Sequence, residues 1–251
     1  MKHFKSHSSY SNFERSVKTN NRYFYDKEIM KFMMKVLEAS VKRVEYIKKG
    51  SHLWRAQLGH SWKPEYQDDI LIGDLPAPYP SERMLPLRHE ASEGRANPKG
   101  IPYLYTATTK ETAMAEVRPW LGSTVSVGSF KTLKKMKLVD CSVNTNKFTI
   151  YFKEPSPKKR EEAVWADIDT AFSKPMTNTD RVADYVPTQV MAEFFKHNGF
   201  DGIAYKSMLA EGHNIVFFDL DSIKLLSCHL FDLKDLKFKF NESANPYYVT
   251  E

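Results

Sequence analysis

The sequence predicts an α+β fold: compact mixed or antiparallel sheets with flanking helices, preceded by an N-terminal helix. Three observations support this prediction. Apolar residues recur at helical spacing near the N-terminus, short β-prone runs recur after residue 100, and further helical segments separate those runs. The 251 residues, 41% of them hydrophobic, suffice for one domain with an appendage or for two small domains.

The N-terminal 50 residues divide into two segments. Residues 1–21 are polar with scattered aromatic residues, which predicts a loosely ordered arm. The apolar spacing that follows predicts an amphipathic helix over residues 26–49, with Asp26 as its N-cap and Gly50 as its stop. Its polar face carries both signs of charge, so we expect it to pack on its own domain rather than on a membrane.

The elements after residue 50 follow from local signals. Residues 53–103 are rich in proline, glycine and charge, which predicts a loop with short strands at best. A capping box with Thr108 as N-cap and Glu111 predicts a helix that Pro119 ends. Residues 153–162 are expected to be a charged loop, and Gly199 is expected to close the last helix. The remaining predictions are strands at 103–107, 125–130, 137–141, 202–205, 214–218 and 223–228, and helices at 163–172 and 187–195.

Composition and missing motifs exclude several classes of protein. Cys141 and Cys228 are the only cysteines, too few for a disulfide framework or a four-cysteine zinc site. A thiol-poor, lysine-rich chain is typical of the cytoplasm, and no apolar stretch has the length of a membrane span or a secretory signal. Glycine-rich nucleotide loops, a G-x-S-x-G motif and metal-ligand histidine spacing are all missing, so an enzyme here would use no metal. The net charge of +6 fits nucleic acid, an anionic small molecule or solubility alone.

Four segments contain side chains of the types that enzymes use for catalysis or for binding an anion. Arg55 follows Leu-Trp, a costly place for a charge unless its head reaches solvent, a carboxylate or a phosphate. Arg95 lies in a Gly-Arg-Ala-Asn-Pro turn, and Glu116 ends an alanine-rich helical segment. Ser207 follows a Gly-Phe-Asp-Gly turn and a strand. Taken singly, each fits a surface turn, a solvated helix or an ordinary strand end as well as a site.

Together these segments resemble the RES-domain proteins, the toxin halves of bacterial Xre–RES toxin–antitoxin pairs. Arg55, Glu116 and Ser207 match the arginine, glutamate and serine that name the family, in order, over roughly residues 52–228. The Gly-Arg-x-Asn-Pro, Pro-Thr-Gln and Gly-x-Asn elements also fit. Ala96 stands where the family often has an aromatic residue, and Met208 where a second serine is common.

The resemblance implies a fold similar to ADP-ribosyltransferase toxins, with a RES-like catalytic domain at 51–230 between the N-terminal segment 1–50 and a tail at 231–251. It implies NAD as substrate and cleavage of its nicotinamide–ribose bond by a glycohydrolase or phosphorylase that depletes cellular NAD. The alternative is a mono-ADP-ribosyltransferase that modifies a host protein. The implied partner is an Xre-family DNA-binding antitoxin, and the helix at 26–49 would serve that interface or a homodimer.

The residues suit this chemistry. Arg55 and Arg95 would bind the pyrophosphate, while Glu116 would stabilise the positive charge that builds on the ribose. Nicotinamide departs neutral, so no general acid is needed, and Ser207 would bond a ribose hydroxyl or the nicotinamide amide. The remaining predicted NAD-binding residues are Tyr105 and Trp54, which offer flat faces, with Asn97 and Tyr205.

Other residues leave alternatives open. Lysine runs at 131–137 and 153–160 would suit a nucleic-acid-binding module, but they lack interleaved aromatic residues and a helix-turn-helix signature. A solvated face is preferred, and no direct contact with nucleic acid is expected. Gln189 and Glu193 fit either the acceptor side of the site or a plain helix surface.

Overall fold

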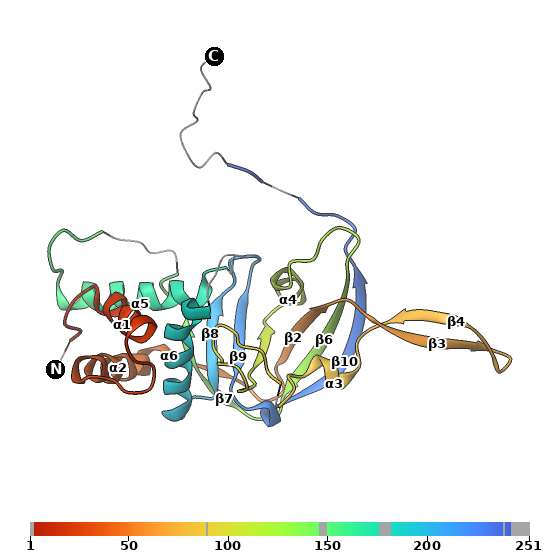
Figure 1. Ribbon diagram of the computed structural model, residues 1–251, viewed down its shortest axis with the longest axis horizontal. Helices are drawn as coiled ribbons and strands as arrows, with labels where there is room; N and C mark the ends of the chain where they lie inside the picture. The colour runs from red at the N-terminus through yellow and green to blue at the C-terminus, as the bar shows by residue number, and fades with distance from the viewer. Residues whose placement is uncertain (1–2, 89, 146–149, 176–181, 238, 242–251) are drawn as a thin grey trace, which may run out of the picture.

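The computed structural model describes residues 3–88, 90–145, 150–175, 182–237 and 239–241. Its centre is an eight-stranded sheet in the order β1-β7-β8-β9-β5-β2-β6-β10, and β3 and β4 form a separate ribbon (Figure 1). The β7–β8 pair is parallel and the other pairs of named strands are antiparallel. The strands are β1 Val44–Ile47, β2 His52–Leu58, β3 Ser61–Gln67, β4 Ile70–Ala77, β5 Leu104–Ala107, β6 Thr124–Thr132, β7 Met136–Cys141, β8 Gly202–Lys206, β9 His213–Phe217 and β10 Ile223–Asp232.

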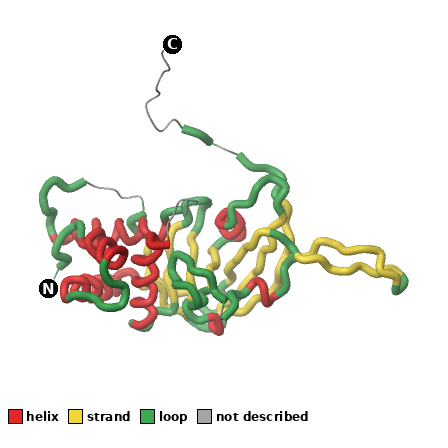
Figure 2. The backbone as a smooth tube through the Cα atoms, in the orientation of Figure 1, coloured by secondary structure: helices red, strands yellow, loops and turns green. Residues whose placement is uncertain are grey.

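Four helices gather at one end of the sheet, beside β7, β8 and β9 (Figures 1 and 2). They are α1 Ser9–Thr19, α2 Lys27–Ser40, α5 Pro157–Ser173 and α6 Val186–His197. The short helix α4, Lys110–Glu116, contacts β2 near the middle of the sheet, and α3, Ser81–Met84, follows the ribbon. Strands and helices thus form the mixed sheet with flanking helices that the α+β prediction requires.

Within residues 3–21, the structure has a helix, α1, in place of the loosely ordered arm that the sequence suggested for residues 1–21. Tyr10, Phe13 and Val17 lie three and four residues apart, which places them on one face of α1, and all three are buried. Phe13 stacks on Phe32 of α2 with ring centroids 5.1 Å apart. The N-terminal helices share one hydrophobic core with α5, α6 and the sheet, so deleting residues 1–50 would open that core.

The predicted helix at 26–49 begins correctly and ends too late. Asp26 caps α2, as predicted, by accepting a hydrogen bond from the Ile29 amide at 2.8 Å. The helix ends at Ser40, and a 3₁₀ turn over Val41–Arg43 leads into β1. Pairing of β1 with β7 overrides the helical pattern there, and Gly50 takes a left-handed turn (φ 86°) before β2.

Removing the Asp26 cap should weaken the fold measurably. We expect Asp26→Ala to lower the free energy of unfolding by about 1 kcal/mol, because it leaves the Ile29 amide without its acceptor. Asp26→Ser should retain most of the stability, since a serine oxygen accepts the same bond. Urea unfolding followed by circular dichroism measures the stability of both variants. Equal unfolding midpoints for Asp26→Ala and Asp26→Ser would contradict the role of Asp26 as N-cap.

Three further predictions need correction. The segment 53–103 contains most of β2 together with β3, β4 and α3, because β3 and β4 pair with each other along their length despite the proline and glycine residues within them. Thr109, not Thr108, caps α4, by accepting from the Thr112 amide at 3.1 Å. Helix α5 begins at Pro157, not near residue 163, because proline is tolerated in a first helical turn. The other predicted strands and the helix opening at Pro187 are confirmed within a few residues.

Candidate active site

The candidate site lies where β2 and β5 separate. These strands pair at Trp54–Ala107 alone, whereas β2 pairs with β6 along its whole length. In the gap, Nη1 of Arg55 donates to the backbone carbonyl of Tyr105 at 3.3 Å. The guanidinium therefore lies between β2 and β5, where the two strands do not pair with each other.

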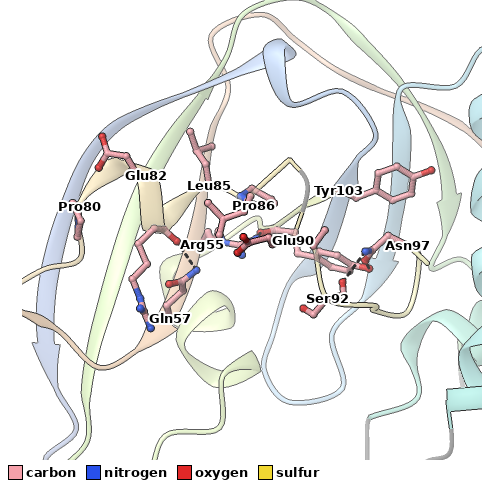
Figure 3. A pocket seen from close by; sticks show the side chains of 14 residues that line it. Arg55, Gln57, Pro80, Glu82, Leu85, Pro86, Glu90, Ser92, Asn97 and Tyr103 are labelled. Carbon is pink, nitrogen blue, oxygen red and sulfur yellow. Dashed lines mark hydrogen bonds between the residues drawn. The ribbon is translucent and has the colours of Figure 1, made fainter. Parts of the chain in front are cut away.

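Arg55 lines a cavity of about 530 Å³ (Figure 3). Burial lowers the pKa of Arg55 to about 10, which still leaves it cationic at neutral pH. Among the residues that the structure describes, no carboxylate lies within ion-pair distance of it, and its Nε is buried without a hydrogen-bond partner. The other residues that line the cavity are Gln57, Pro80, Glu82, Arg83, Leu85, Pro86, Leu87, Glu90, Ala91, Ser92, Asn97, Tyr103 and Tyr105.

A second arginine, Arg43, has the carboxylate partner that Arg55 lacks within the described part of the chain. The side chain of Arg43 is 9% exposed, and its Nη1 donates to both carboxylate oxygens of Asp169 at 3.0 Å. It also lies over the ring of Trp165, 4.1 Å from the centroid. Buried charges are ordinarily paired in this way, so Arg55, with no described carboxylate within ion-pair distance, keeps N–H groups with which it could bind an external anion.

The loop at 92–101 forms one wall of the cavity, and Asn97 organises it. The Asn97 side-chain nitrogen donates to the carbonyls of Ser92, Pro98 and Ile101 at 2.9, 3.2 and 2.9 Å. Its oxygen accepts from the Tyr105 hydroxyl at 2.8 Å. Both predicted NAD-binding residues thus line the cavity, but their polar atoms bond the loop.

Helix α6 supports the same loop, which the sequence did not reveal. Nε2 of Gln189 donates to the carbonyls of Gly94 and Asn97 at 2.9 and 3.1 Å. The Thr188 hydroxyl donates to the carbonyl of Arg95 at 2.6 Å. The Pro-Thr-Gln segment therefore braces the loop, which explains why its polar residues open a buried helix.

Glu116 and Ser207 form a second cluster close to the gap. The Ser207 hydroxyl donates to Oε1 of Glu116 at 2.7 Å, and Nδ2 of Asn214 donates to the same oxygen at 2.6 Å. Ser207 Oγ in turn accepts from the amides of Leu209 and Ala210 at 3.2 and 3.3 Å. The end of α4, the end of β8 and the start of β9 together hold one carboxylate oxygen in place.

The two clusters lie along the same strand. Asn214 faces Ala107 of β5, and the Arg55 contact is made two residues earlier, at Tyr105. Two residues of a strand span about 7 Å. The structure therefore places the Glu116–Ser207 cluster beside Arg55 along β5, although neither Glu116 nor Ser207 lines the cavity at Arg55, and it adds Asn214, which sequence analysis treated only as part of a motif.

Three predicted NAD-binding residues lie away from the cavity. The Arg95 guanidinium donates to the carbonyl of Ala171 at 2.7 Å and to that of Lys174, at the end of α5. It would have to leave both carbonyls to reach a pyrophosphate. Trp54 packs with the small apolar cluster below α4, and Tyr205 packs in the main core, where burial raises its pKa.

Comparison with known families decides the identity. The model of the RES domain matches residues 52–240, which include Arg55, Glu116 and Ser207. The chain belongs to the RES-domain family. A search of solved structures finds the crystal structure of the M. tuberculosis MbcT-MbcA toxin-antitoxin complex, at 12% identity and a TM-score of 0.39, covering 78% of this chain and 92% of that one. No curated protein matches the sequence.

Other features of this RES domain bear on partners. Within the described ranges, no helix has the length and apolar character to cross a membrane, and no three metal-ligating side chains cluster. The lysine run at 131–137 is largely engaged. Lys134 pairs with Asp219 at 3.3 Å, and Lys135 and Lys137 lie over aromatic rings. These contacts explain part of the run as ordinary surface structure.

Proposed function

We propose that this RES domain binds NAD and cleaves its nicotinamide–ribose bond, as a toxin restrained by an Xre-type antitoxin. The observation that carries the proposal is Arg55, a cation that lines a cavity of about 530 Å³ and has no described carboxylate within ion-pair distance. Cavities of roughly 300–1,000 Å³ are typical of small-molecule sites. The toxin role and the antitoxin rest on the family resemblance.

Arg55 suits the pyrophosphate of NAD. Its planar guanidinium presents two parallel N–H groups to two phosphate oxygens, and such charge-assisted bonds are about twice as strong as neutral ones. Arg55 is itself largely buried, and a charge in such surroundings attracts an anion more strongly than it would in bulk water. Because Arg95 is held at the end of α5, Arg55 alone is assigned the phosphates.

Glu116 suits the ribose. As nicotinamide leaves, positive charge develops on the sugar in an oxocarbenium-like state, and a fixed carboxylate stabilises that charge. The bonds from Ser207 and Asn214 fix Oε1 before the substrate arrives. Since the Ser207 hydrogen is already donated to Glu116, we assign Ser207 a positioning role rather than direct contact with the ribose.

Incubating the purified protein with NAD tests the proposal. We expect NAD to be lost and nicotinamide to be released in equal amounts. The second product identifies the acceptor: free ADP-ribose indicates water, its phosphorylated form indicates phosphate, and labelled protein indicates transfer. Unchanged NAD after incubation with folded protein free of any antitoxin would overturn the proposal.

The positioning role of Ser207 has its own test. Ser207→Ala removes one of the two bonds that orient Glu116, and we expect kcat to fall about tenfold, with KM nearly unchanged. In a Glu116→Gln background the same substitution should have little further effect, because the two residues act as a unit. Independent, multiplicative losses would contradict this role.

A further inference from the structure

Helix α6 buries a glutamine near its start. Gln189 is 8% exposed, and most of the other residues that α6 buries are apolar. A buried amide costs free energy unless its hydrogen bonds are made. Nε2 of Gln189 makes them by donating to the carbonyls of Gly94 and Asn97. Both acceptors belong to the loop at 92–101, so the side chain of Gln189 acts on that loop.

Two helices hold this loop at neighbouring residues. From α6, the Thr188 hydroxyl donates to the carbonyl of Arg95 at 2.6 Å. At the end of α5, the carbonyl of Ala171 accepts a hydrogen bond from the Arg95 guanidinium at 2.7 Å. The two bonds from Gln189 fall just before and just after Arg95. The backbone of the loop is therefore tied to the helices at three successive places.

The loop in turn encloses the ring of Tyr105. The Tyr105 hydroxyl donates to Oδ1 of Asn97 at 2.8 Å and accepts from the amide of Ala96 at 2.9 Å. A Cβ atom on Gly94 would lie 2.7 Å from the same hydroxyl oxygen, so the lack of a side chain there lets the backbone come this close. The loop and the ring therefore pack as one unit.

This unit forms a wall of the cavity at Arg55. Ser92, Asn97 and Tyr105 line that cavity, and Figure 3 shows the hydrogen bond between Ser92 and Asn97. Gln189 is not one of the residues that line it. A ligand held by Arg55 would contact the wall, so a shift of the wall would change those contacts. Misplacement by about 1 Å can cost about a hundredfold even when the altered residue is remote from the ligand.

The carboxylate of Glu116 is held by other elements. Within the described part of the chain, its hydrogen bonds come from Ser207 and Asn214, and neither of these side chains bonds the loop at 92–101. A change in the loop should therefore alter the binding of NAD more than the step that Glu116 assists.

We propose that Gln189 is a positioning residue for the binding of NAD. Its two hydrogen bonds hold the loop at 92–101 against the ring of Tyr105, and this sets the wall that a diphosphate held by Arg55 would contact. The role rests on the proposed function, because it requires that the cavity takes the diphosphate of NAD. It replaces the two interpretations of Gln189 that the sequence left open, the acceptor side of the site and a plain helix surface.

Binding of ADP-ribose tests this role without any cleavage, because ADP-ribose contains the diphosphate but no nicotinamide. Gln189→Met keeps the length of the side chain and removes both N–H donors. We expect its Kd for ADP-ribose, measured by isothermal titration calorimetry, to rise about tenfold, since two hydrogen bonds that hold the wall are lost. An unchanged Kd would overturn the role of Gln189 and leave the proposed function intact. Failure of the wild-type chain to bind ADP-ribose would overturn the proposed function itself, and this role with it.

The kinetics of NAD cleavage separate positioning from damage to the fold. Gln189→Met should raise KM for NAD about tenfold and change kcat by less than about twofold. Partial unfolding would instead lower the apparent kcat at an unchanged KM, and that result would contradict the positioning role.

Two further variants complete the test. Asn198→Leu is the matched control, because Nδ2 of Asn198 donates to the carbonyl of Phe194 at the other end of α6, and its Kd for ADP-ribose should equal that of the wild type. A rise as large as that of Gln189→Met would show that the effect is not specific to the loop. Thr188→Val keeps the shape of the side chain, removes the bond to the carbonyl of Arg95 and should raise the Kd about threefold. Should Gln189→Met fail to fold, Thr188→Val decides, and a wild-type Kd would then overturn the proposal.

Discussion

Glu116→Gln is expected to lower the rate of NAD cleavage by about a hundredfold or more while leaving the fold intact. The amide keeps the size of the side chain and still accepts bonds from Ser207 and Asn214. It carries no negative charge, so it cannot offset the charge that develops on the ribose. Release of nicotinamide under saturating NAD measures the effect.

A carboxylate elsewhere on the surface provides the control. Glu162→Gln removes one negative charge from an exposed position on α5, away from the site, and should leave turnover unchanged. Equal thermal midpoints would establish that both variants are folded. Wild-type turnover in folded Glu116→Gln would remove Glu116 from the chemistry.

Arg55→Met is expected to raise KM for NAD about ten- to hundredfold without lowering the stability of the fold. Hydrogen bonds to charged groups contribute about 1.5–3 kcal/mol, which gives that range. Methionine fills the space of the arginine stem, no described carboxylate within ion-pair distance loses a partner, and the one described hydrogen bond that is lost is the long 3.3 Å contact with the Tyr105 carbonyl. Removing a buried cation that lacks a counter-ion saves its desolvation cost, so the thermal midpoint should stay equal or rise.

Arg43→Met is the matched control because it should behave in the opposite way. It leaves the buried carboxylate of Asp169 without its arginine, and breaking such a pair costs about 3–5 kcal/mol. A fall in stability for Arg55→Met with unchanged KM would assign Arg55 to the fold instead of the ligand. Titration of each variant with NAD, beside a thermal melt, separates the two outcomes.

Local sequence signals predicted the helix ends that carry a capping or turn residue. Asp26, Pro187 and Gly199 set helix ends by a side-chain acceptor, a fixed φ and a left-handed turn, none of which depends on the rest of the chain. Arg55, Glu116 and Ser207 were found because they match a family pattern. Their convergence required the order of the strands, which no local signal contains.

The errors have a common physical origin in tertiary contacts. Helix α1 is stabilised by burial of Phe13 against α2, and β1 by its pairing with β7, so neither is evident from a short window. Arg95 was assigned to the ligand because a glycine-rich turn suits an anion. That role stays a prediction, and in the structure the carbonyls at the end of α5, some 80 residues away in sequence, accept hydrogen bonds from its guanidinium.

In the gap between β2 and β5, two kinds of hydrogen bond compete for one acceptor. Pairing of the strands would use the backbone carbonyl that the side chain of Arg55 now contacts. The carbonyl of Tyr105 has two alternative donors, the Arg55 guanidinium or an amide of a strand that closed against β5. A variant in which the two strands paired along their length would gain backbone bonds and erase the cavity. Selection for stability alone would thus favour closing the sheet, and under the proposed function the open form persists because binding of an anion to Arg55 offsets the lost backbone bonds.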